Sequence, residues 1–75
     1  MVKNEELQAK IEELEKSIQV RENQRMRSIA AIVGALVDKV EPNETEVKIF
    51  KLMSQIIENE CNELRLLKDQ LNVSE

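Results

Sequence analysis

The stretch "RSIAAIVGALVDKVEPN" (residues 27–43) joins the most apolar part of the chain to its single proline. Pro42 has no backbone N–H and disfavours helical geometry at the residue before it, so a helix is expected to end here. Asn43 belongs to the residue types that favour the N-cap of a new helix. The stretch therefore predicts one helix that ends near Val40 and a second that begins at about residue 44.

Composition predicts that the rest of the chain is helical as well. The 75 residues include one glycine, one proline and one phenylalanine, while 35% are charged and 41% are hydrophobic. Few breakers and few aromatic residues are typical of long helices. The predicted fold is all-α, with a first helix over about 3–40, a turn at 41–43 and a second helix over about 44–72 that folds back as a helix-turn-helix hairpin. The whole chain (1–75) is expected to be a single helical oligomerisation module.

A heptad pattern marks the start of the first helix. Leu7, Ile11, Leu14 and Ile18 are spaced by 4, 3 and 4 residues, with isoleucine at position a and leucine at position d. This combination favours a parallel two-stranded coiled coil. Residues 4–18 therefore predict a coiled-coil stem that pairs with a second copy of the chain, although two heptads are too short to hold a dimer alone.

The pattern changes after the stem. Strict continuation of the heptads places Arg21 and Arg25 in the core, whereas an 11-residue step lands on Glu22, Met26 and Ile29 and keeps the helix continuous. The seam reached by that step consists of Met26, Ile29, Val33, Leu36 and Val40. This part of the helix is apolar on almost every side, so it is expected to be surrounded by neighbours. Gly34 either allows close backbone approach there or is simply tolerated.

The second helix is predicted to present a broad apolar face toward the first. That face consists of Phe50, Met53, Ile57, Leu64, Leu67 and Leu71, widened by Ile49, Ile56 and Cys61. We expect a hairpin register in which Val40 meets Val47 and Val33 meets Met53. In this register the second helix ends beside Ile18 or Leu14, which leaves the start of the stem free.

Glu60 is the polar exception within this face. It follows Ile57 and precedes Leu64 at the spacing of the apolar residues. One interpretation is that it turns to solvent at the edge of the bundle. The other is a partly buried ion pair with Arg25 or Arg27, which would fix the register of the hairpin more than add stability.

The composition argues against several classes of function. The chain has no histidine, and Cys61 is its only cysteine, so the usual general base, a thiol–histidine pair and a zinc site are all missing. The predicted set of catalytic, cofactor-binding and metal-binding residues is empty, and the chain is not expected to be an enzyme. A net charge of −4 argues against a nucleic-acid partner. The longest apolar run spans nine residues, too few for a membrane helix, so no membrane partner is expected.

The leading hypothesis is a structural self-association module. Two hairpins would form a homodimeric four-helix bundle, with the stems paired in parallel. The predicted oligomer interface consists of Leu7, Ile11, Leu14, Ile18, Met26, Ile29, Val33, Leu36, Val40, Phe50, Met53, Ile57, Leu64 and Leu67. The expected setting is a larger intracellular (cytoplasmic or nuclear) scaffold of the cytoskeletal or centrosomal type. The alternative is an adaptor hairpin that binds an amphipathic helix of a different protein.

Overall fold

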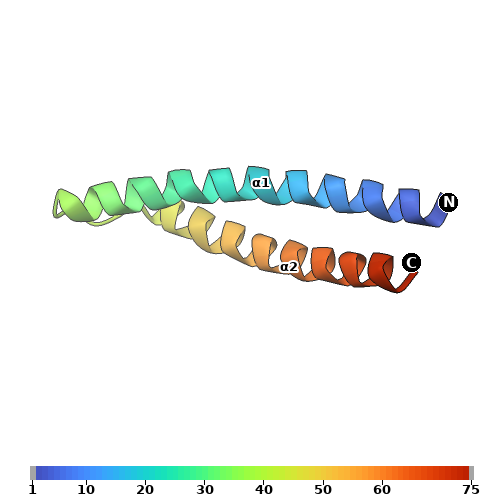
Figure 1. The fold of residues 1–75 in the computed structure, drawn as a ribbon. Coiled ribbons are helices and arrows are strands. Elements are labelled where there is room, and N and C mark those ends of the chain that lie inside the picture. The colour runs from blue at the N-terminus through green and yellow to red at the C-terminus, as the bar shows by residue number, and fades with distance from the viewer. Residues whose placement is uncertain (1, 75) are drawn as a thin grey trace.

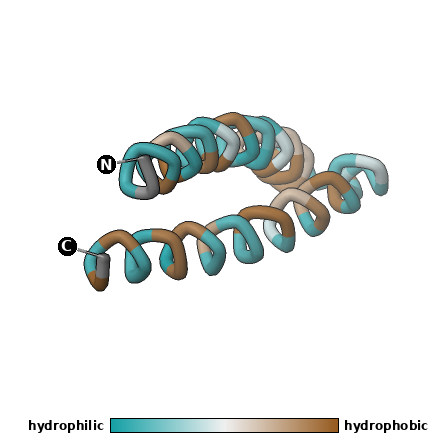
Figure 2. The backbone as a smooth tube through the Cα atoms, turned by 90° about the vertical axis from the view of Figure 1, so that its right-hand side faces the viewer, coloured by the Kyte–Doolittle hydropathy of each residue, from teal (hydrophilic) through white to brown (hydrophobic). Residues whose placement is uncertain are grey.

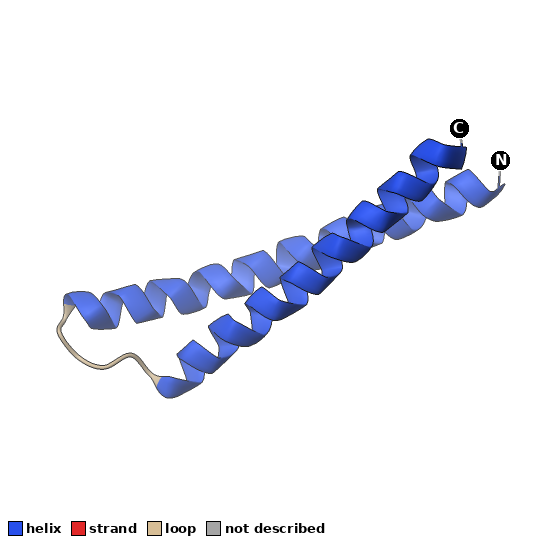
Figure 3. Ribbon diagram, turned by 90° about the horizontal axis from the view of Figure 1, so that it is seen from below, coloured by secondary structure: helices blue, strands red, loops and turns tan. Residues whose placement is uncertain are grey.

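A computed structural model describes residues 2–74 of the chain, which form a hairpin of two long helices (Figure 1). Helix α1 spans Val2–Val37 and helix α2 spans Glu44–Ser74. The helices run antiparallel, so that both chain ends lie opposite the turn (Figure 3). The molecule measures 56 × 16 × 14 Å along its principal axes. The predicted all-α hairpin is confirmed.

The turn begins with a backbone motif that the sequence did not signal. Lys39 has a left-handed backbone (φ 60°), its N–H donates to the Leu36 carbonyl at 3.1 Å, and the N–H of Val40 donates to the Ala35 carbonyl at 3.0 Å. This pair of hydrogen bonds is the Schellman motif, which satisfies the last carbonyls of a helix and usually has glycine at the left-handed position. Helix α1 therefore ends three residues before the predicted Val40.

Helix α2 begins where the sequence predicts. The side-chain Oδ1 of Asn43 accepts a hydrogen bond from the backbone N–H of Thr45 at 2.8 Å, and the Asn43 carbonyl accepts one from the N–H of Val47 at 3.1 Å. Asn43 is thus the N-cap of α2, as predicted. Glu44 and Glu46 lie in the first turn, where negative charge is favoured by the helix dipole.

The register of the hairpin differs from the prediction by about one helical turn. Arg21 lies 3.6 Å from Glu60 and Glu15 lies 3.8 Å from Lys68, measured between side-chain nitrogen and oxygen atoms. The last turns of α2 consequently lie beside Ile11, so α2 also runs alongside the start of the stem, which was expected to stay free. The cause is the connection, which occupies residues 38–43. Because α1 ends three residues earlier than predicted, each residue of α2 lies beside a residue of α1 that comes earlier in the sequence.

One continuous heptad face of α1 packs against α2, and we call it the hairpin seam. Ile11 and Ile18 are each 8% exposed and Ser28 is 2% exposed, while Arg21 and Arg25 are half-buried. The predicted 11-residue step is therefore wrong. On α1 the seam consists of Asn4, Leu7, Ile11, Leu14, Ile18, Arg21, Arg25, Ser28, Ile32 and Ala35.

The predicted face of α2 does face α1. Ile57 is 7% exposed, and the other members are half-buried: Phe50, Met53, Leu64, Leu67 and Leu71. In Figure 2 hydrophobic and hydrophilic segments alternate along α2, as expected of a helix that is covered on one side. Glu60 belongs to this face, because its side chain is 16% exposed.

Candidate interaction surface

Helix α1 carries a second row of apolar residues, which α2 does not cover. Met26 is 66% exposed, Val33 50% and Val37 74%. These residues follow 3/4 spacing along α1, on the face next to the hairpin seam, and Val40 in the turn extends the row at 58% exposure. We call this row the α1 stripe: Met26, Ile29, Val33, Leu36, Val37 and Val40.

The α1 stripe is confined to the half of the molecule nearest the turn. At the same spacing toward the N-terminus, the next positions are Glu22 and Gln19, followed by Glu15 and Glu12. These residues are polar, and three of the four are exposed while Glu22 is half-buried. The apolar surface therefore ends at Met26, and beyond it the same face of α1 is acidic.

Residues of α2 lie next to the α1 stripe on the same side of the molecule. The contact between Glu15 and Lys68 fixes which flank of α2 lies beside the stripe. Steps of seven residues from that contact, along the two antiparallel helices, bring Cys61 beside Glu22 and Ser54 beside Ile29. The Ser54 hydroxyl is buried without a hydrogen-bond partner, and Cys61 is exposed as a free thiol.

The structure divides the predicted interface into two groups. The larger group lies in the contact between α1 and α2 of one chain: Leu7, Ile11, Leu14, Ile18, Phe50, Met53, Ile57, Leu64 and Leu67. The remaining predicted residues, from Met26 to Val40, lie in the α1 stripe. The predicted register placed Met53 beside Val33, whereas Met53 lines a groove with Gln24 and Ser28 and Val33 is 50% exposed. This second group is the more exposed of the two.

The centre of the hairpin seam contains a pair of oppositely charged residues, Arg21 on α1 and Glu60 on α2. The prediction named Arg25 or Arg27 as the partner of Glu60, and the one-turn change of register explains why Arg21 takes that place. Both Arg21 Nε and Glu60 Oε1 are buried and lack a hydrogen bond, because the 3.6 Å between them exceeds hydrogen-bonding distance. A long arginine side chain can pack its aliphatic part in the seam while its charge stays close to the surface.

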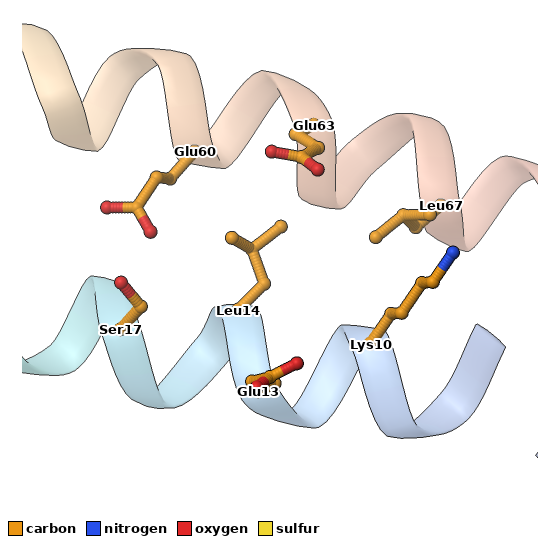
Figure 4. Close-up of a pocket in the computed structure, with 7 residues that line it drawn as sticks. All are labelled: Lys10, Glu13, Leu14, Ser17, Glu60, Glu63 and Leu67. Atoms are coloured by element: carbon orange, nitrogen blue, oxygen red, sulfur yellow. The ribbon is translucent and has the colours of Figure 1, made fainter. Parts of the chain in front are cut away.

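An open groove lies beside this ion pair, between the two helices (Figure 4). Leu14 and Leu67 project into the space between α1 and α2, with Glu60 pointing toward Ser17 and Glu63 farther along α2. The groove has leucine side chains at its base, and both acidic side chains and Lys10 line it. Its lining consists of adjoining positions on two packed helices.

Some features of this surface were not predicted. The predicted register, in which Val40 meets Val47 and Val33 meets Met53, turns Val37 toward the second helix, yet Val37 is among the most exposed apolar residues. An added Cβ at Gly34 would meet no heavy atom within 4 Å, so Gly34 makes no close approach inside the hairpin. A signal for the true seam did exist, since Arg21, Arg25 and Ser28 continue the heptad spacing of the stem.

The described part of the chain carries neither a metal-binding cluster nor a membrane-spanning helix. Within residues 2–74, no cluster of three or more cysteine, aspartate or glutamate side chains is arranged to hold a metal ion. Neither described helix has a segment long and apolar enough to cross a membrane. No protein-family model matches the chain, and no curated protein and no solved structure does so either.

Proposed function

We propose that this chain is a self-association module, in which two hairpins pack through their α1 stripes and form a four-helix bundle. The observation that carries the proposal is the α1 stripe itself. Five large apolar side chains follow one another on one face of α1 and Val40 follows them in the turn, each of the six between 39% and 74% exposed. Contiguous apolar surface of this kind on a small protein marks an interaction site, and a bundle gives each α1 a second apolar neighbour.

The dimensions of the hairpin support the same proposal. Its radius of gyration is 16.9 Å, against roughly 11 Å for a compact domain of this length. Its accessible surface is 6004 Å², whereas a compact monomer of this mass exposes roughly 4,700 Å². Stable interfaces bury about 800 Å² per partner, so association of two hairpins would lower the exposed surface to roughly 5,200 Å² per chain and remove part of this excess.

Such a module acts by bringing two chains together, and no reaction is involved. We place it in the class of structural proteins, as an oligomerisation segment of a larger intracellular scaffold of the cytoskeletal or centrosomal type. The chemistry of the surface supports this class, because the exposed groups in its centre are aliphatic side chains and a thioether.

The test is the mass of the protein in solution, measured by sedimentation equilibrium over a wide concentration range. The unmodified chain is expected to be a dimer at micromolar concentration. Val33→Glu is expected to be a helical monomer, because it places an unpaired charge in the centre of the interface. Circular dichroism checks that the hairpin remains folded.

Leu66→Glu provides the matched control. Leu66 lies on α2 outside the hairpin seam and is 59% exposed, close to the 50% of Val33. The same chemical change there is expected to leave the dimer intact. A soluble helical monomer for the unmodified chain would contradict self-association and would favour the adaptor alternative, in which the α1 stripe binds a helix of a different protein. Equal effects of the two substitutions would show that the stripe is not the interface.

A further inference from the structure

We infer that the partner of the α1 stripe is a second copy of this chain in antiparallel orientation, with the two turns pointing in opposite directions and the stripes overlapping around Val33. The inference rests on the proposed self-association and adds its geometry. It differs from the parallel pairing that the N-terminal heptads suggest. Three features of the described residues support it.

The first feature is that the stem is already occupied. Parallel pairing was expected because Leu7, Ile11, Leu14 and Ile18 form a heptad seam. In the hairpin those residues pack on α2, and Ile11 and Ile18 are each only 8% exposed. The stem therefore has no free apolar face with which to align two copies in parallel.

The second feature is the acidic face that continues the α1 stripe toward the N-terminus. In a parallel dimer in register, Glu22, Glu15 and Glu12 of one copy would face the same residues of the other copy, which is unfavourable. In an antiparallel dimer centred on Val33, the stripe of each copy ends beside the turn of the other. Glu15 and Glu12 then extend past the partner into solvent, where their charges are hydrated.

The third feature is charge complementarity between the two ends of the stripe. Arg21 is left out of this comparison because it pairs with Glu60 of its own chain. Residues 22–27 contain two arginines and one glutamate, a net charge of +1, whereas residues 38–46 contain one lysine and four acidic residues, a net charge of −3. Antiparallel packing places the positive segment of each copy beside the negative segment of the other, twice per dimer. Parallel packing would place like charges side by side. Complementary charges of this kind select orientation more than they add affinity.

Distances between spin labels test the orientation directly. Cysteine is introduced at Lys16 or at Gln24, two exposed positions of α1 outside the stripe, in a Cys61→Ser background. With 1.5 Å of rise per residue, an antiparallel dimer centred on Val33 separates the two Lys16 sites by roughly 50 Å along the helix axis and the two Gln24 sites by roughly 27 Å. A parallel dimer in register gives short and nearly equal distances at both sites, because the helix axes lie about 10 Å apart.

The result separates failure of the orientation from failure of the proposed function. Short distances at both sites in a protein that sediments as a dimer would overturn the antiparallel inference and leave self-association standing. A monomer in sedimentation, without any intermolecular distance, would contradict both. A long distance at Lys16 and a distance at Gln24 shorter by roughly 24 Å is the expected result.

Charge reversal provides an independent check. Arg27→Glu, at an exposed position outside the hairpin seam, is expected to weaken the dimer several-fold, and Asp38→Lys together with Glu41→Lys is expected to do the same. The three changes combined are expected to restore most of the affinity, since each segment again faces opposite charge. Absence of rescue in the combined variant would overturn the proposed pairing of the two segments. The weakening should also decrease at high salt, which screens exposed charges.

Discussion

Helix α1 has two rows of residues at heptad-like spacing, and they lie in opposite environments. The hairpin seam includes Arg21, Arg25 and Ser28 in its middle, yet Ile11 and Ile18 in the same seam are buried. The α1 stripe is apolar at each position from Met26 to Val37 but remains open to solvent. The comparison shows that the more apolar face of a helix is not necessarily the one that packs within its own chain.

The geometry of the turn explains which row is used. Because Lys39 adopts a left-handed backbone, α1 ends at Val37 and the chain needs residues 38–43 to reverse direction. This places α2 over the face that continues the N-terminal heptads. Along the whole hairpin, that face offers more apolar contact than the α1 stripe, which stops at Met26. A short stripe of high hydrophobicity therefore remains for contacts between molecules.

The two rows should differ most in how much the free energy of unfolding falls when an isoleucine is replaced by alanine. Ile18→Ala removes a side chain that is 8% exposed, and it should lower the free energy of unfolding by about 2–4 kcal/mol. Ile29→Ala, on the same helix but 39% exposed, should cost about 1 kcal/mol or less. Urea unfolding in a Val33→Glu background measures folding without the contribution of association.

For self-association, Ile29→Ala should have the larger effect and Ile18→Ala the smaller one. In the otherwise unmodified chain, Ile29→Ala should weaken self-association, whereas Ile18→Ala should act on it only through the loss of folded protein. If the two alanine variants unfold at the same urea concentration in the monomeric background, the assignment of Ile18 to the seam and Ile29 to the stripe is contradicted.

Several elements of the fold could be predicted from the sequence because their signals are local. Pro42 and Asn43 act through the conformations of their own and adjacent residues, so the start of α2 at residue 44 was predicted correctly. The face of α2 was also predicted, since Phe50, Met53 and Ile57 follow one uninterrupted periodicity. The apolar character of residues 26–40 was visible as well.

The register could not be predicted, because it depends on where α1 ends. Nothing in the residue type of Lys39 distinguishes it as a left-handed position, where glycine is the usual choice. An error of three residues there moved the predicted contacts by a full turn. The same error placed Arg25 or Arg27 opposite Glu60, where the structure has Arg21.

The Arg21–Glu60 pair offers a second and smaller test of the comparison, because it is the charged part of an otherwise apolar seam. Arg21→Met leaves the 16% exposed Glu60 side chain without its partner and should cost about 1–3 kcal/mol. Adding Glu60→Leu should bring the stability back to within about 1 kcal/mol of the original, since replacing both members of such a pair by apolar residues is often neutral. Urea midpoints of the single and double variants measure this.

The pair between Glu15 and Lys68 is the matched control, because both side chains are about half exposed. Lys68→Met should change stability by about 0.5 kcal/mol or less. A cost of Arg21→Met no greater than that of Lys68→Met would show that the seam does not depend on a charged partner at its centre.

The smallest expected effect on the free energy of unfolding comes from the turn, whose geometry determines which of the two rows packs against α2. Lys39→Gly should raise the free energy of unfolding by about 0.5–1 kcal/mol, because glycine adopts the left-handed backbone at φ 60° without steric cost. Asp38→Gly is the control: Asp38 does not have a positive φ, so glycine there should only add disorder to the unfolded chain and lower stability. A lower urea midpoint for Lys39→Gly would contradict the role of the left-handed residue. If it stabilises the hairpin while the dimer mass stays the same, the turn specifies the seam and leaves the α1 stripe available, as the structure implies.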